Sequence, residues 1–277
     1  MAAWKIAAVQ MDCRLGDCKG NLEAIRTRLE TAATRGAMLV VFPECISSGY
    51  GFRTKAEALP HAEPMPGPGT EALAADCRRL GVWTVVGMLE RDGDRLFNAA
   101  ALIGPTGVAA VYRKVHLPCL GVDRFTTPGD RPFSVHDLGG LRVGINICYD
   151  GSFPEASRVL ALLGADLIVL PTNWPPNAWR NPKFVVQTRA LENHVYYAAV
   201  NRVGEESGFG FIGQSRIVDC SGDLLASTDG DEDTILYAIV DPALARNKRV
   251  VNIPGEYEVD RIGDRRPEMY GPVCAAQ

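Results

Sequence analysis

Residues 141–150 read LRVGINICYD, an apolar run that stops abruptly at a thiol, an aromatic ring and a carboxylate. The run predicts a buried strand, and Phe153-Pro154-Glu155 predicts the start of a helix. A residue between two such elements lies at the edge of a sheet beside free backbone N–H groups, which favour a thiolate. The segment therefore indicates a nucleophile at Cys148, with a buried structural cysteine as the alternative interpretation.

Strand and helix patterns alternate along the rest of the chain. The hydrophobic periodicity predicts helices over residues 21–35, 70–80, 154–163 and 181–193, and strands over residues 4–11, 38–42, 82–88, 96–103, 108–112, 141–147, 166–170, 195–201, 214–219, 224–226 and 234–240. This alternation predicts an α/β (α+β) protein in which helices cover a mixed sheet. Residues 1–277 contain no linker, low-complexity block or fixed-period repeat, so we expect a single domain.

The composition argues against several classes of partner. The formal net charge of -4 argues against nucleic-acid and anionic-membrane partners, which need concentrated Lys and Arg. The N-terminal segment has no secretion-signal pattern, and no apolar run approaches the roughly twenty residues that span a bilayer, so we expect a cytoplasmic protein. The eight cysteines include no C-x-x-C pair and the four histidines no ligand pair, which argues against zinc and thioredoxin-type sites.

Two further strand ends carry charged residues. Glu44 follows the predicted strand 38–42, and Lys114 follows the predicted strand 108–112. Because ligands bind at the carboxyl ends of strands in open α/β sheets, we expect both residues to meet Cys148 in one pocket. Alone, each reads better as an exposed surface charge. Together they supply the nucleophile, the base and the oxyanion cation that amide hydrolysis needs.

The residues around these strand ends resemble the nitrilase superfamily of carbon–nitrogen hydrolases. The matching segments are VFPE at 41–44, SGY at 48–50, YRKVHLP at 112–118 and ICYD at 147–150, with FN at 97–98, RALEN at 189–193 and NR at 201–202 in support. The resemblance extends from residue 8 to about residue 240. Its three-part signature of glutamate, lysine and cysteine is specific to that family.

The resemblance implies a four-layer α-β-β-α sandwich and an amidase or N-carbamoyl amidohydrolase. It implies Glu44 as general base, Lys114 as oxyanion stabiliser and Cys148 as nucleophile, with no metal or organic cofactor. It also implies a homodimer or higher homo-oligomer. The tail of about residues 250–277 either contributes to an oligomer interface or is a solvated extension.

The loop after Lys114 departs from the family pattern. Many members carry a second glutamate there, whereas this loop reads CLGVDRF at 119–125 and offers only Asp123. Asp123 either orients Lys114 or the attacking water as an auxiliary acid, or it is a turn aspartate that pairs with Arg124.

The pair Tyr149-Asp150 narrows the substrate class. Nitrile-cleaving members usually carry Trp-Glu at this position, whereas amidases and carbamoyl hydrolases usually carry Tyr-Asp. We therefore expect a small linear amide or N-carbamoyl substrate, a thioester on Cys148, release of ammonia, and the Tyr149 backbone N–H as a second oxyanion donor. A true nitrilase and a catalytically silent binding protein are the alternatives. For Asp150 itself we expect a capping or turn role.

Residues that follow other strands are expected to select the substrate. Tyr50 and the pair Asn173-Trp174 are the candidates for substrate binding, and the prolines after Trp174 stiffen that loop. Trp179 is either a further pocket wall or a core residue. Arg202 either binds a substrate carboxylate or forms a structural ion pair.

Overall fold

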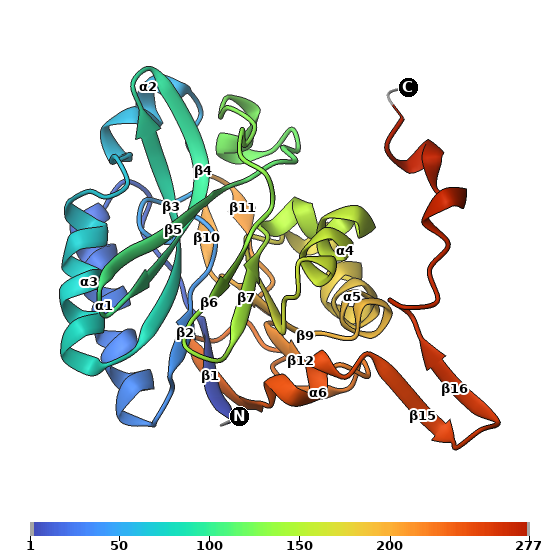
Figure 1. Ribbon diagram of the computed structural model, residues 1–277. Helices are drawn as coiled ribbons and strands as arrows, with labels where there is room; N and C mark the ends of the chain where they lie inside the picture. The colour runs from blue at the N-terminus through green and yellow to red at the C-terminus, as the bar shows by residue number, and fades with distance from the viewer. Residues whose placement is uncertain (1–2, 276–277) are drawn as a thin grey trace.

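The protein contains two six-stranded mixed sheets (Figure 1). The computed structural model describes residues 3–275. In the first sheet, β1, β2 and β3 run parallel and the other neighbours run antiparallel. Its strands lie in the order β14 (Thr234–Val240), β1 (Trp4–Gln10), β2 (Leu39–Val41), β3 (Trp83–Asp92), β4 (Arg95–Gly104) and β5 (Gly107–Arg113).

The second sheet has a parallel centre of β7, β8 and β9, flanked by antiparallel neighbours. Its strands lie in the order β13 (Leu224–Ser227), β12 (Arg216–Val218), β9 (Tyr196–Asn201), β8 (Leu167–Thr172), β7 (Arg142–Ile145) and β6 (Val135–Asp137). Parallel strands at the centre of each sheet place their carboxyl ends at one edge, which is where loops gather side chains for a site.

The two faces of each sheet are both buried, but against different partners. In β1, Ile6 and Ala8 pack into a core shared with the second sheet, whereas Ala7 and Val9 pack under helices. Alternate residues of a strand point to opposite faces, so this split follows from the strand geometry. Helices α1 (Cys18–Thr34) and α3 (Pro68–Leu80) cover the first sheet, and α4 (Pro154–Leu162) and α5 (Val186–Asn193) cover the second.

The resulting layers are helix, sheet, sheet and helix, which confirms the four-layer α-β-β-α sandwich. The single mixed sheet expected from the alternation of elements was wrong, because the main strands of the described residues form two six-stranded sheets. Periodicity identifies strands but does not say which strands share hydrogen bonds. Since the central strands bury both faces, their near-continuous apolar runs look the same in one sheet or in two.

Some element bounds differ from those expected. Helix α1 begins three residues early because the Asp17 side chain caps it, accepting a hydrogen bond from the backbone of Gly20. The helix expected over 181–193 is divided into a π-helical turn at Asn181–Val185 and α5. The strand β6 was not predicted, because three residues are too short for a periodic pattern.

Short elements complete the fold. They are α2 (Lys55–Ala58), α6 (Pro242–Arg246), the hairpins β10 (Glu205–Glu206) with β11 (Phe209–Gly210) and β15 (Arg249–Ile253) with β16 (Tyr257–Asp260), and 3₁₀ turns at Leu59–His61, Gly121–Arg124, Cys148–Ser152, Pro176–Ala178, Pro267–Met269 and Gly271–Val273. None of the helices within residues 3–275 is long and apolar enough to cross a membrane.

The C-terminal tail projects from the sandwich as the β15–β16 hairpin and a following extended segment (Figure 1). The hairpin was not predicted from the sequence. Apolar side chains of the tail are exposed, among them Ile253, Tyr257 and Met269. Residues 276 and 277 of the predicted tail lie outside the described part of the chain, and an oligomer interface formed by this tail stays a prediction.

Candidate active site

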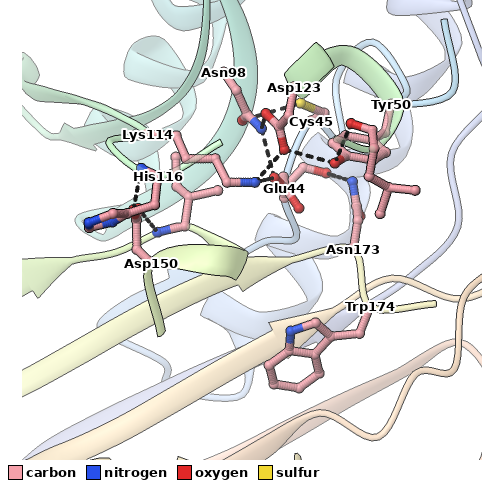
Figure 2. Close-up of polar contacts among 12 residues, drawn as sticks. Glu44, Cys45, Tyr50, Asn98, Lys114, His116, Asp123, Asp150, Asn173 and Trp174 are labelled. Carbon is pink, nitrogen blue, oxygen red and sulfur yellow. Dashed lines mark hydrogen bonds and ion pairs between the residues drawn. The ribbon is translucent and has the colours of Figure 1, made fainter. Parts of the chain in front are cut away.

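Glu44 and Lys114 come from strands that are not neighbours, yet their side chains meet (Figure 2). Lys114 Nζ lies 2.7 Å from Glu44 Oε1, and both side chains are fully buried. Gly87 on β3 makes room for the backbone after β2, because a Cβ there would lie 2.5 Å from the Cα of Glu44. A glycine is therefore required where the loop that carries Glu44 crosses β3.

The two carboxylate oxygens of Glu44 have different surroundings. Oε1 accepts hydrogen bonds from Lys114 and from Asn98 Nδ2, each at 2.7 Å. Oε2 is buried and has no hydrogen-bond partner among the described residues. A carboxylate oxygen with free lone pairs is able to accept a proton, so Oε2 is the oxygen of Glu44 that is available for one.

The charges of this site shift each other's protonation. Burial raises the pKa of Glu44, although the ammonium of Lys114 opposes that shift. Burial alone would lower the pKa of Lys114, but the carboxylates of Glu44 and Asp123 more than offset it and hold that pKa well above its usual value. Lys114 therefore stays a cation, whereas Glu44 holds a proton more readily than an ordinary glutamate does.

Asp123 lies near Glu44 at the ammonium of the lysine and joins the same cluster (Figure 2). Its Oδ2 is 2.5 Å from Lys114 Nζ and accepts a hydrogen bond from the Tyr50 hydroxyl at 2.8 Å. Arg124 instead donates to the backbone carbonyls of Gly121 and Phe52. The geometry thus favours the first interpretation of Asp123, an acid that orients Lys114, over a turn aspartate paired with its neighbour.

Cys148 opens the 3₁₀ turn after β7 with a left-handed backbone, at φ 44°. The residue as a whole is partly exposed, unlike Glu44 and Lys114. Burial of the sulfur and the negative charge of Glu44 raise the pKa of the thiol to about 12, against the opposing effect of Lys114. Desolvation of the sulfur therefore outweighs the nearby backbone N–H groups that favour a thiolate, so the thiol needs a base.

Asp150 fixes the turn that carries Cys148. Its carboxylate is fully buried and accepts hydrogen bonds from the Ile147 backbone at 3.0 Å, the Tyr112 hydroxyl at 2.7 Å and the His116 backbone at 2.9 Å. Tyr112 lies in β5, His116 follows β5 and Ile147 follows β7, so Asp150 ties the end of β5 to the turn after β7. The capping role expected for Asp150 is confirmed.

Replacing Asp150 with alanine should lower the free energy of unfolding by about 3 kcal/mol, because it leaves several buried donors without an acceptor. Chemical denaturation followed by tryptophan fluorescence measures this change. Asp94→Ala, at an exposed position, is the matched control and should change stability by less than about 0.5 kcal/mol. Equal stability of the two variants would contradict the assignment.

The predicted substrate-binding residues are mostly buried. Tyr50 is 2% exposed and uses its hydroxyl on Asp123. Asn173 donates from Nδ2 to the backbone carbonyl of Glu44 at 3.0 Å. Trp174 is 2% exposed and packs in the core beneath α5. Tyr50 and Asn173 thus support the candidate catalytic groups through hydrogen bonds, and Trp174 lies in a core cluster against which Cys148 packs. Direct contact with substrate stays a prediction for each.

Two open alternatives are resolved by burial. Trp179 is 39% exposed and stacks against Arg180, so its interpretation as a core residue was wrong. Arg202 is fully buried and pairs with Glu206 and Asp12, which favours a structural ion pair over a substrate carboxylate site. The side chain of Tyr149 is partly exposed beside Phe153, and only its backbone N–H was assigned a role.

Asn98 is a residue of the site whose role sequence reasoning missed. It lies in β4, in the apolar run LFNAAALIG, and its side chain contacts both Glu44 and Asp123. One polar side chain within a buried strand needs partners, and this was the available signal.

Within residues 3–275, no group of three or more His, Cys, Asp and Glu side chains is arranged to hold a metal ion.

Known proteins resemble this chain over nearly its whole length. The carbon-nitrogen hydrolase family model matches residues 5–250. A nitrilase from Pyrococcus abyssi is 39% identical over 96% of this chain and 98% of its own. An omega-amidase from Homo sapiens is 31% identical over 87% of this chain and 90% of its own. A variant of the amidase from Nesterenkonia sp. AN1, with covalent addition of the acetamide moiety of fluoroacetamide at the active site cysteine, superposes with a TM-score of 0.80 at 26% identity, over 96% of this chain and 95% of that one.

Proposed function

The chain belongs to the carbon–nitrogen hydrolase family and acts on amides, and from this premise we propose that it hydrolyses a small linear amide or N-carbamoyl compound through a thioester on Cys148. The observation that carries the proposal is the buried Glu44–Lys114–Asp123 cluster, in which Glu44 Oε2 is free to accept a proton. A resting thiol with a pKa of about 12 needs such a base.

In the first half-reaction, Glu44 Oε2 takes the thiol proton as the sulfur of Cys148 attacks the carbonyl carbon. The ammonium of Lys114 and the backbone N–H of Tyr149 stabilise the oxyanion that forms. The tetrahedral intermediate then collapses to a thioester. The C–N bond breaks, and the proton held by Glu44 leaves with the nitrogen as ammonia.

In the second half-reaction, Glu44 accepts a proton from water while the water oxygen attacks the thioester carbon. Lys114 and the Tyr149 N–H stabilise the second oxyanion in the same place. Collapse breaks the C–S bond and releases the acid, and the thiolate regains its proton from Glu44. For an N-carbamoyl substrate the released acid is a carbamic acid, which splits into carbon dioxide and an amine.

The substrate class is tested with a panel of small linear amides, N-carbamoyl amines, N-carbamoyl acids and nitriles, each assayed for ammonia. We expect turnover of at least one amide or carbamoyl compound well above that of its matching nitrile. Intact-mass measurement during turnover should show the acyl group on the protein, and peptide mapping should place it on Cys148. Turnover of nitriles alone, without amides, would contradict the proposal.

The pH profile should show an acid limb set by Glu44. Because burial raises the pKa of this carboxyl, the base form is lost at a pH above the ordinary glutamate value of 4.5. We expect kcat/KM to rise with pH through a single ionisation above that value, while Lys114 stays charged throughout. Initial rates between pH 4 and 9 measure the limb. An acid limb at or below 4.5 would argue against Glu44 as the base.

A further inference from the structure

Asn98 bridges the two acids of the site (Figure 2). Its side chain is 1% exposed, and its Nδ2 donates one hydrogen bond to Glu44 Oε1 at 2.7 Å and another to Asp123 Oδ1 at 2.9 Å. A primary amide has two N–H groups, so both are used, and both acceptors are carboxylates. The amide therefore donates both of its N–H groups to the two acids and has no remaining donor for a substrate.

The orientation of this amide is fixed by a thiol. Cys45 Sγ lies 3.4 Å from Asn98 Oδ1 and donates to it, from a fully buried position just after Glu44. A flipped amide would direct its oxygen at two carboxylates and its nitrogen at the thiol. The backbone carbonyl of Asn98 also accepts the N–H of Lys114 at 2.8 Å. One residue of β4 thus contacts the base, the auxiliary acid and the backbone of the cation.

Resting on the proposed function, we propose that Asn98 is a positioning residue for the base. Its two amide donors hold the ionised carboxylates of Glu44 and Asp123 against Lys114, and they occupy Glu44 Oε1 so that only Oε2 is left for the thiol proton. The amide does this without carrying charge. A second cation at this position would instead lower the basicity of Glu44 further.

The charge balance of the site explains why such a donor is needed. Two carboxylates and one ammonium leave an excess negative charge in a buried environment, which favours protonation of an acid. Glu44 faces Lys114 and Asp123 directly, and its charge also acts on the thiols of Cys148 and Cys45 and on the Tyr50 phenol. These last three groups are neutral when protonated. Hydrogen bonds from Asn98 therefore add to Lys114 in keeping Glu44 ionised.

The test replaces Asn98 with leucine, which has a similar size and no hydrogen-bonding atoms. We expect kcat on the best amide to fall about tenfold to a hundredfold with little change in KM, because the base is affected more than substrate binding. We also expect the acid limb of kcat/KM to move upward by about one pH unit, because lost hydrogen bonds to a carboxylate favour its protonated form.

The matched control is Asn193→Leu, which removes a fully buried amide at the end of α5 that donates to Arg189. It should leave the acid limb in place, even if it lowers stability. An unmoved acid limb in a folded Asn98→Leu protein would overturn the proposal. An equal upward shift of the acid limb in Asn193→Leu would also overturn the proposal, because the shift would then reflect a general loss of stability.

If Asn98→Leu does not fold, the pair Cys45→Ala and Cys45→Ser decides. Serine keeps a donor to Asn98 Oδ1 and alanine removes it, so only the alanine variant should raise the acid limb. Identical limbs in the two variants would overturn the role of the oriented amide. Failure of the proposed function is distinguishable, because it would appear as ammonia release that persists in Cys148→Ala.

Discussion

Replacing Cys148 with alanine is expected to abolish ammonia release from every amide that the wild-type protein hydrolyses. The thiol is the nucleophile in the proposed reaction, and no other group supplies the covalent step. Loss of a nucleophile lowers kcat by at least about 10⁴-fold in hydrolases that form an acyl-enzyme. A continuous assay for ammonia, with the acyl adduct measured by intact mass, detects both the missing turnover and the missing intermediate.

The control for this experiment is Cys77→Ala, because Cys77 is buried under the first sheet in α3, away from the candidate catalytic groups. This variant should keep its turnover and its acyl adduct, although its stability should fall. Folding of Cys148→Ala is checked by its thermal transition, which should lie close to that of the wild type. Persistent ammonia release with no adduct on residue 148 would reject the thioester mechanism.

The strands that face two hydrophobic layers were the most predictable part of the fold. The segments that became β1, β3, β4 and β9 differ from the expected strands at their ends by only a few residues, and the partly exposed edge strand β14 has the expected bounds 234–240. A strand that is buried on both faces has a long apolar run in its sequence. Short or exposed elements have no such apolar run, which explains why β6 and the β15–β16 hairpin were not predicted.

The expectation that Glu44 and Lys114 meet followed from chemistry at the ends of strands, whereas Asp123 was singled out by the comparison of its loop with the family pattern. What the sequence did not reveal is the set of contacts around them, because these depend on side chains that approach across the sheet. Asn98 is separated from Glu44 by more than fifty positions, and only the pairing of β3 with β4 brings them together. The raised pKa of the Cys148 thiol was not apparent from the sequence for the same reason, since burial is a property of the assembled fold.

Replacing Lys114 with methionine is expected to give the second largest effect. The loss of one oxyanion donor typically lowers kcat by about 10²- to 10³-fold. A further loss follows here, because Glu44 and Asp123 then lie together in a buried site without a cation, and their repulsion keeps a proton on the base. We expect ammonia release to fall by more than about 10³-fold, and unfolding to require about 3 to 5 kcal/mol less free energy.

A double variant, Lys114→Met with Asp123→Asn, separates the two consequences. Asparagine removes one of the two carboxylates, so the site no longer holds two unpaired negative charges, and much of the lost stability should return. Turnover should not return, because no cation is present to stabilise the oxyanion. The comparison needs only thermal transitions and ammonia assays on three proteins. Recovery of both stability and turnover in the double variant would show that Lys114 acts by balancing the buried acids, and that the oxyanion is stabilised by other donors.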